Sequence, residues 1–394
     1  MQKATRQHTK EHNRRLVLKT IFEHGGISRA DIARRTKLTR ATVSEIVGSL
    51  MDAGLVTEIG VAASSGGKPP VLVGLVDDAR QSICVDLSTD RYYGAVVNLR
   101  GKILHRYALQ APQGEERASL QPVYELIDHL MGIATAPVLG IGVSTPGLVD
   151  TREGVIRQAV NRGWVDLPLR ELLFDRYHCP VYVANDSHMM ALAEYTFGHL
   201  GQIENLVVVK ISEGIGAGIV IGGRLYCGDG FGAGEIGHFS VVEDGERCSC
   251  GNLGCLETVA SVRAIVRHAN VIAEEHPDSL LARRAAAEGI SLATVAWAFH
   301  AGDPLVRELV RAAARYLGVA IAGLISLLNI HEVILTGEFV EFGDFVLEEV
   351  RKEVTRRVLP RMATETHIAF STLGSDAMFL GTSALVLAEE LGVP

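Results

Sequence analysis

The chain has 394 residues, enough for two or three domains with a large core. Apolar residues make up 47% of it, which is ordinary for a soluble globular protein, and the polar first twenty residues lack the apolar core of a signal peptide. The longest apolar run, residues 317–328, is too short to span a bilayer, so we expect no membrane partner.

Charge divides the chain into a basic head and an acidic body. Residues 1–75 contain twelve basic and six acidic residues, a net charge of +6, whereas the whole chain carries −8 and the remainder therefore −14. This asymmetry of charge predicts that the head binds a polyanion and the body does not. The alternative is that the basic residues of the head only form a solvent-exposed surface. The six cysteines are unevenly clustered, which fits a reducing cytoplasm better than a disulfide scaffold.

Residues 1–78 are predicted to form a winged helix-turn-helix. Apolar residues at helical spacing, from Leu18 to Phe22 and from Val43 to Leu50, predict the first and third helices. Ser28 and Thr39 are the predicted N-caps of the second and third. The three helices together match a tri-helical helix-turn-helix.

The outer face of the third helix carries short polar side chains and one long basic one, which can reach base edges and phosphates in a major groove. Residues 55–59 and 71–75 alternate like strands, and the loop between them is predicted to be a wing whose Lys68 touches a phosphate or the minor groove. Pro69-Pro70 is expected to stiffen the exit from this wing and to couple the head to the body. Helix-turn-helix units also serve as protein-binding modules, but basic charge and a wing favour DNA. The predicted DNA-binding residues are Thr39, Arg40, Ala41, Thr42, Ser44 and Lys68.

Two lobes are expected after the head, at residues 79–200 and 201–394, with the C-terminal helix returning to the first. In the first lobe, strands are predicted at 82–87, 92–99, 102–107, 138–143 and 180–184, and a helix at 120–131. In the second, strands are predicted at 206–211, 219–221, 331–335 and 366–370, and a closing helix at 377–390.

The stretch from Gly234 to Glu257 brings four metal-binding residue types within eighteen positions. It reads Gly-Glu-Ile-Gly-His, then nine residues, then Cys-Ser-Cys-Gly-Asn-Leu-Gly-Cys-Leu-Glu. Three thiolates and one imidazole suit one structural, tetrahedral Zn²⁺ per chain, the alternative being a disulfide or free buried thiols. The predicted ligands are His238, Cys248, Cys250 and Cys255.

This stretch is similar to the zinc motif of the ROK family (repressors, open reading frames, sugar kinases). The matching pattern is Gly237-His238, the spacer and Cys-x-Cys-Gly-x-x-Gly-Cys-x-Glu. The similarity extends over roughly residues 80 to 390, and the head and its wing resemble those of the family's repressor branch. The resemblance implies an α/β fold: a winged helix-turn-helix followed by two actin-like (RNase H-like) sugar kinase lobes.

The resemblance also implies a sugar site in the cleft between the lobes. In the family, an Asn at a strand end binds the sugar, and the following Asp binds its reacting hydroxyl and acts as base; Asn185 and Asp186 match them. Asp186 could instead only cap the helix that follows. The sugar-binding residues implied by the resemblance are Asn161, Asn185, Asp186, Glu235, His238 and Glu257.

Three nucleotide loops depart from the kinase pattern of the family. Asp-x-Gly-Gly-Thr-Lys is replaced by the sequence at 86–91, which has no glycine, and Gly-Thr-Gly-Ile-Gly by the sequence at 212–216, which introduces Glu213. The adenosine-side Gly-Gly becomes Gly337-Glu338. Glycine lets backbone amides approach phosphates, and added carboxylates repel them, so nucleotide binding is not expected.

These observations predict a sugar-responsive transcriptional repressor that binds operator DNA as a homodimer or tetramer, with Asp186 a vestigial base and no kinase activity. An active ATP-dependent sugar kinase with a regulatory DNA-binding head is the first alternative. A repressor controlled by a protein partner is the second. The sugar, its phosphorylation state, the operator and the sign of the sugar effect do not follow from the sequence.

Overall fold

A computed structural model describes residues 6–62, 69–88, 90–114, 118–159, 162–198 and 203–393. These residues form two compact units: unit 1 comprises residues up to 203 together with 375–394, and unit 2 comprises residues 204–374. The second lobe was expected at 201–394 with its C-terminal helix returning to the first lobe, and residues 375–394 lie in unit 1. Unit 1 also includes the head, which is not a separate compact body.

The head contains the three predicted helices and two predicted strands, with one further short strand. Its helices are α1 (Arg6–His24), α2 (Arg29–Thr36) and α3 (Arg40–Asp52), and its strands are β1 (Ile27–Ser28), β2 (Val56–Val61) and β3 (Val71–Leu75). Strand β3 lies between β1 and β2 and is antiparallel to both. Ser28 and Thr39 accept hydrogen bonds from the backbone N–H groups of Asp31 and Thr42, which makes them the N-caps of α2 and α3.

The link between the head and the first lobe is short and does not involve the wing. Pro69 and Pro70 lead directly into β3, so they lie inside the head and not in the segment that joins it to the lobe. Residues 76–80 make the connection, and the N–H of Leu99 in the lobe donates to the carbonyl of Asp77 there. The predicted wing tip, including Lys68, lies outside the described residues.

The first lobe is built on a five-stranded sheet. Its strands are β4 (Gln81–Asp86), β5 (Arg91–Asn98), β6 (Ile103–Gln110), β7 (Val138–Thr145) and β11 (Val181–Asn185), in the order β11-β7-β4-β5-β6. The first three form an antiparallel meander, and β7 and β11 continue the sheet in parallel with β4. A small antiparallel sheet, not predicted from the sequence, consists of β8 (Leu148–Asp150), β9 (Val155–Ala159) and β10 (Trp164–Leu167).

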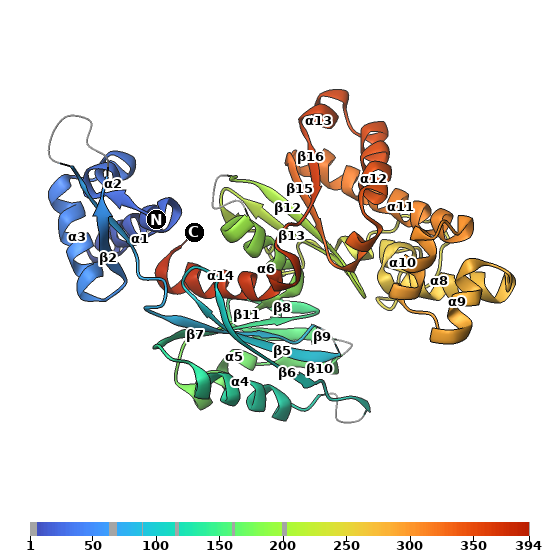
Figure 1. Cartoon of the computed structure of the whole chain (residues 1–394), viewed down its shortest axis with the longest axis horizontal. Helices are drawn as coiled ribbons and strands as arrows, with labels where there is room; N and C mark the ends of the chain where they lie inside the picture. The colour runs from blue at the N-terminus through green and yellow to red at the C-terminus, as the bar shows by residue number, and fades with distance from the viewer. Residues whose placement is uncertain are drawn as a thin grey trace. The chain divides into compact units, whose positions relative to one another are not determined.

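Helices cover both faces of the large sheet (Figure 1). They are α4 (Gln121–Ile133) and α5 (Leu169–Tyr177) on one face, and α6 (Asp186–Ala193) and α14 (Ala377–Leu391) on the other. Strand side chains alternate between the faces, so Ile83 and Val85 join the core under α4 and α5 while Cys84 packs with Phe379 of α14. Helix α6 continues into a π-helical turn, η3 (Glu194–Gly198).

Unit 2 repeats this strand order in a second sheet. Its strands are β12 (Leu206–Ile211), β13 (Ile215–Ile221), β14 (Arg224–Leu225), β15 (Glu332–Thr336) and β16 (His367–Phe370), in the order β14-β13-β12-β15-β16. Again a meander is extended by two parallel strands. Strand β13 begins four residues earlier than predicted, because its alternating glycines lie within the strand. The repeated topology confirms the two-lobed actin-like fold.

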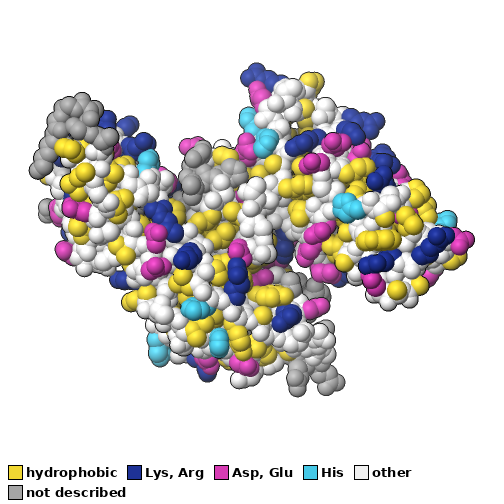
Figure 2. All heavy atoms as spheres, viewed as in Figure 1, with side chains coloured by type: hydrophobic (Ala, Val, Ile, Leu, Met, Phe, Trp, Pro, Cys, Tyr) yellow, Lys and Arg dark blue, Asp and Glu magenta, His cyan; other side chains and the backbone are white. Residues whose placement is uncertain are grey.

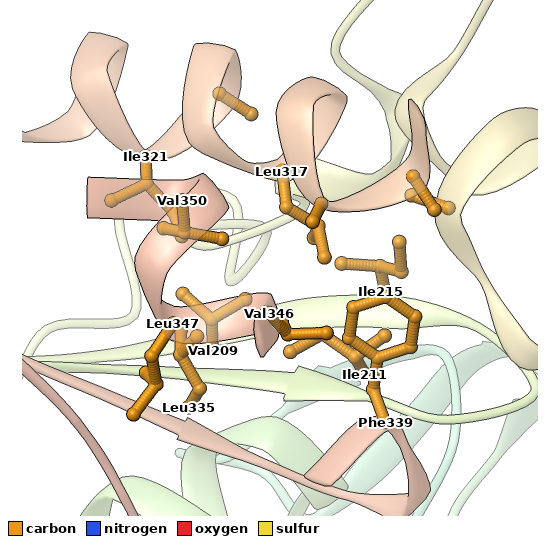
Figure 3. Packing of buried hydrophobic residues seen from close by; sticks show 14 of the residues in the cluster. Val209, Ile211, Ile215, Leu317, Ile321, Leu335, Phe339, Val346, Leu347 and Val350 are labelled. Carbon is orange, nitrogen blue, oxygen red and sulfur yellow. The ribbon is translucent and has the colours of Figure 1, made fainter. Parts of the chain in front are cut away.

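The helices of unit 2 are α7 (Leu256–Ala260), α8 (Val262–Glu275), α9 (Leu280–Glu288), α10 (Leu292–His300), α11 (Pro304–Leu328), α12 (Asp344–Arg357) and α13 (Pro360–Glu365). By length and composition, α11 could cross a membrane, but half of its most apolar stretch is buried. Figure 3 shows Leu317 and Ile321 of α11 packed with Val346 and Val350 of α12 over side chains of the sheet. Helix α11 is therefore the central core helix of unit 2.

Candidate functional site

The predicted recognition helix presents its polar face to solvent. Helix α3 buries Val43 and Leu50 in the head core, while Arg40, Ala41 and Ser44 are exposed at its N-terminal end. Thr39 is exposed as well, and its hydroxyl lies 2.8 Å from that of half-buried Thr42. Of the predicted DNA contacts, all but Lys68 lie within the described residues, and they share this one surface.

Two further cations extend this surface and were missed in the sequence analysis. Arg35 at the end of α2 and Lys37 in the turn are exposed, and neither forms an ion pair with any residue that the structure describes. Arg34 differs, because it pairs with Asp31 on the same helix. With Arg40, these two residues place three positive charges around the start of α3 that form no ion pair within the described part of the chain. Their position next to the turn is a signal in the sequence that could have suggested them as candidate phosphate contacts.

Unit 2 shows no comparable charge separation on the face drawn in Figure 2. Basic and acidic side chains are interspersed there over the helices of the unit. Unit 2 also contains paired charges, since Glu353 of α12 contacts Arg315, Arg356 and Arg357. Interspersed charge does not attract a polyanion as a single-signed surface does, so the head remains the candidate nucleic-acid surface.

The four predicted metal ligands converge in unit 2. The ligand atoms of His238, Cys248, Cys250 and Cys255 all lie within 4.8 Å of one another. Cys250 Sγ is 3.7 Å from Cys255 Sγ, and Cys248 Sγ is 3.5 Å from His238 Nδ1. Around a tetrahedral Zn²⁺ with Zn–S of about 2.3 Å, sulfurs lie about 3.8 Å apart and sulfur and nitrogen about 3.5 Å apart. The cluster therefore fits a tetrahedral metal ion.

Backbone geometry around the cysteines brings the three sulfurs together. Gly251 and Gly254 both have positive φ, +99° and +67°, which glycine adopts without strain. A Cβ on Gly254 would overlap the carbonyl oxygen of Val242, so the chain passes there at a distance that only glycine permits. The N–H of Cys248 donates to the carbonyl of Asn252, closing the loop between the ligands.

The thiols of this cluster differ in acidity. Burial raises the pKa of Cys255 to about 12, whereas a backbone hydrogen bond at Asn252 lowers the pKa of exposed Cys250. A coordinating Zn²⁺ deprotonates such thiols outright, so the buried position of Cys255 is compatible with ligation.

His238 turns its second ring nitrogen toward a carboxylate. Its Nε2 lies 3.8 Å from Oε2 of Glu235, whose side chain is 44% exposed. A metal on Nδ1 of His238 would leave the proton on Nε2 and fix the orientation of the ring. The Nε2–H donor of His238 would then lie beside the carboxylate acceptor of Glu235. Such a pair can bind a sugar hydroxyl.

Glu257 is held by a network that the sequence did not reveal. Cys255 is the N-cap residue of α7, so the metal site also positions the first turn of this helix, where Glu257 lies. The Glu257 carboxylate accepts a hydrogen bond from the N–H of Ile215 at 3.3 Å and pairs with Arg263 of α8 at 3.2 Å. Arg263 also donates to the carbonyl of Glu213. Ile215 and Glu213 lie 42 and 50 positions from their partners Glu257 and Arg263, so no local pattern identified this network.

Asn185 and Asp186 lie at the start of α6 in unit 1. Asn185 is the N-cap residue of this helix. Its Oδ1 accepts from the N–H of Ser187 at 2.8 Å, and its Nδ2 donates to the carbonyl of Gly147 at 2.8 Å. Asp186 is the first helical residue, and its Oδ1 also accepts from the Ser187 N–H. The cap that we considered for Asp186 is therefore supplied mainly by its neighbour. Asn161 lies outside the described residues.

The structure thus gathers the predicted sugar contacts into two groups. Glu235, His238 and Glu257 surround the metal cluster in unit 2, and Asn185 and Asp186 lie together at the end of β11 in unit 1.

The ROK family matches residues 82–389, almost the whole of the two lobes. This chain belongs to the ROK family. A winged helix-turn-helix DNA-binding family matches residues 10–57. The two lobes of this ROK protein thus match the ROK family, and its head matches a winged helix-turn-helix family.

Three ROK relatives illustrate what the chain is similar to. The xylose repressor of Caldicellulosiruptor bescii is 30% identical over 391 residues, which is 98% of both chains. The crystal structure of a ROK family transcriptional regulator, a homolog of the E. coli MLC protein, has a TM-score of 0.87 and 30% identity, covering 98% of both chains. A ROK family glucokinase from Streptomyces griseus, solved with glucose and AMPPNP, has a TM-score of 0.68 and 30% identity, covering 77% of this chain and 98% of the glucokinase.

The first altered nucleotide loop of this ROK protein is filled by its own groups. The Asp86 carboxylate accepts a hydrogen bond from the N–H of Ser88 at 3.0 Å, and Arg162 donates to the carbonyl of Leu87 at 3.1 Å. Arg162 is only 6% exposed, and its guanidinium lies 5.0 Å from the ring centre of Tyr92. The backbone amide and the cation that could approach a phosphate therefore have internal partners.

The other two loops retain glycines for structural reasons. A Cβ on Gly214 would lie 2.7 Å from Oε2 of Glu257, so this glycine makes room for the carboxylate that binds the Ile215 amide. A Cβ on Gly337, where φ is +96°, would overlap the carbonyl oxygen of Ile211. Close packing against neighbouring segments accounts for both residues without a nucleotide.

Proposed function

We propose that this ROK protein is a sugar-responsive, DNA-binding transcriptional regulator that acts as a repressor in the cytoplasm. The observation that carries the proposal is the union of a winged helix-turn-helix and a ROK domain in one chain, aligned over nearly its full length with a xylose repressor. The glucokinase covers 77% of this chain, which is about the share that follows residue 78, as expected for a regulator with an added DNA-binding head.

DNA binding is assigned to the head. Arg40, Ala41 and Ser44 contact base edges and phosphates in a major groove, Thr39 and Thr42 fix the start of α3, and Arg35 and Lys37 neutralise adjacent phosphates. Lys68 contacts a phosphate or the minor groove from the wing. Two heads of a dimer or tetramer bind a roughly palindromic operator, since a two-fold assembly matches a two-fold site.

Sugar binding is assigned to the two groups of polar residues. In unit 1, Asn185 and Asp186, together with Asn161, hydrogen-bond sugar hydroxyls, and in unit 2, Glu235, His238 and Glu257 do so. Zn²⁺, held by His238, Cys248, Cys250 and Cys255, would fix His238 and the first turn of α7. The zinc is structural, because four protein ligands leave no open position for catalysis. Asp186 acts as a hydroxyl ligand and not as a base.

Sugar controls DNA binding through a shift between two arrangements of the chain. A ligand shifts such an equilibrium only by its differential affinity for the two states. Coupling of about 1–3 kcal/mol is typical and corresponds to roughly 5–150-fold in operator affinity.

The test is operator affinity with and without sugars. The full chain is titrated against DNA upstream of its own gene at fixed salt, because phosphate contacts make affinity salt-dependent. D-xylose is tested first, followed by a panel of mono- and disaccharides, with ATP absent. We expect one sugar to change the dissociation constant about tenfold. If the chain does not bind this DNA, or binds it identically with every sugar, the proposal is wrong.

A second candidate function is ATP-dependent sugar phosphorylation, favoured by the likeness to the glucokinase and by the presence of Asp186. Phosphate transfer to D-glucose or D-xylose that depends on ATP, and that Asp186→Asn abolishes, would establish it. We expect no transfer, because the amides of Ser88 in the first loop and Ile215 in the second have internal partners.

A further inference from the structure

The hydrophobic core of the head is completed by residues of the first lobe. Val17, Leu18 and Phe22 of α1 belong to the same buried cluster as Leu99, at the end of β5, and Leu391, at the end of α14. A domain that shares its core cannot turn freely on a linker, since separation would expose apolar surface to water. The head is thus docked within unit 1, and its position depends on the residues that make the contact.

Arg100 makes the polar contact at this junction. It lies in the turn between β5 and β6, and its Nη1 donates to the backbone carbonyl of Phe22 at 2.5 Å. Its guanidinium carbon lies 4.8 Å from the centre of the Phe22 ring, and its Nε pairs with Asp77 at 3.2 Å. One side chain from the lobe therefore contacts both the last turn of α1 and the segment that links the head to the lobe.

The turn that carries Arg100 is held firmly by its neighbours. The side chain of Asn98, only 3% exposed, accepts hydrogen bonds from the N–H groups of Arg100 and Lys102 and donates to Asp78. These hydrogen bonds make residues 98–102 a rigid turn. A displacement of one residue in this turn therefore also displaces Arg100.

The same turn packs against the end of α6. Gly101 has φ of +80°, and a Cβ there would lie 2.7 Å from Cε1 of Phe197 and 2.9 Å from Cδ2 of Leu380. Phe197 lies in η3, the π-helical continuation of α6, and it also contacts the shared core. Helix α6 starts at Asp186, so one continuous helical segment joins a proposed sugar contact to the turn that holds the head.

We propose that Arg100 is the positioning residue that couples the sugar site to the DNA-binding head. This inference rests on the proposed function, because it takes Asp186 to be a sugar ligand. A shift of α6 on sugar binding moves Phe197, which abuts the backbone of Gly101, and the turn then moves Arg100 against Phe22 of α1. The π-helical turn lies between Asp186 and the contact with Gly101, and such irregular turns are frequent at functional sites.

The test compares Arg100→Ala with Lys102→Ala in the full chain. Both variants remove one cation from the same turn, but Lys102 is exposed and its side chain has no described partner on the head. The readout is the ratio of operator dissociation constants with and without D-xylose. Arg100→Ala should reduce this ratio about three- to tenfold while leaving D-xylose affinity within twofold of the wild type. Lys102→Ala should leave the ratio unchanged, and Arg100→Lys should recover part of it by donating to the Phe22 carbonyl.

A second measurement needs no sugar. In the sugar-free full chain, amide hydrogen exchange in the last turn of α1, residues 21–24, should be faster in Arg100→Ala than in the wild type or Lys102→Ala. Equal exchange in all three proteins overturns the positioning role. If no sugar changes the operator affinity of the wild type, the proposed function is refuted instead. If a sugar changes the operator affinity of the wild type and of Arg100→Ala equally, only this inference is refuted.

Discussion

Replacing Gly254 with alanine should disrupt the metal site, and the structure gives the size of the effect. Gly254 immediately precedes the ligand Cys255, and a Cβ there overlaps the carbonyl oxygen of Val242. Relieving the overlap requires a displacement of about 1 Å, which exceeds the roughly 0.2 Å tolerance of metal–ligand distances. An alanine at φ +67° also costs about 1–2 kcal/mol in backbone conformation, and the overlap adds about 1–3 kcal/mol.

Gly251→Ala is the matched control, because Gly251 lies in the same loop and also has positive φ, yet a Cβ there meets no atom within 4 Å. It should cost only the conformational term, about 1–2 kcal/mol, and should retain the metal.

The assay is zinc content per chain after purification without added metal, together with the midpoint of thermal unfolding. Gly254→Ala should contain far less than one zinc and should unfold at a clearly lower temperature than Gly251→Ala. If both variants retain one zinc and unfold together, the overlap with Val242 does not constrain the ligands, and our account of the loop is wrong.

Three further predictions concern the metal, the DNA surface and the sugar site. Cys250→Ser should remove zinc and lower thermal stability; one zinc per chain with an unchanged melting curve would show that the ligand set is wrong. Arg40→Ala should weaken operator binding, reduce the salt slope by about one unit and leave sugar binding unchanged, and an unaltered operator affinity would contradict the recognition-helix assignment. Arg263→Ala should weaken sugar binding up to about fivefold, because a half-exposed ion pair contributes at most about 1 kcal/mol. The control Arg283→Ala, at an exposed position of α9, should leave sugar affinity unchanged. If calorimetry gives equal sugar affinities for the two variants, Arg263 does not belong to the sugar site.

Features that depend on neighbouring residues could be predicted from the sequence. The caps at Ser28 and Thr39 and the buried stripe of α3 follow from hydrogen bonds and spacings within one helix. The metal ligands fall within eighteen positions, so a tight loop alone suffices to bring them together. The resemblance carried by this motif also led to the correct fold for the two lobes.

Features that depend on contacts between distant segments were decided only by the tertiary structure. Arg162 reaches a carbonyl 75 positions away and Arg100 one 78 positions away, and neither residue belongs to a pattern in its own segment. From the sequence we expected Pro69-Pro70 to couple head and body, whereas in the structure the head contacts the first lobe through Arg100 and the shared core. A local sequence pattern reflects the periodic spacing of side chains along one helix or strand. Tertiary packing brings together side chains from different segments, and no regular spacing in the sequence links them. The sequence by itself therefore determined the parts of this protein, and the tertiary structure decided how its head is held.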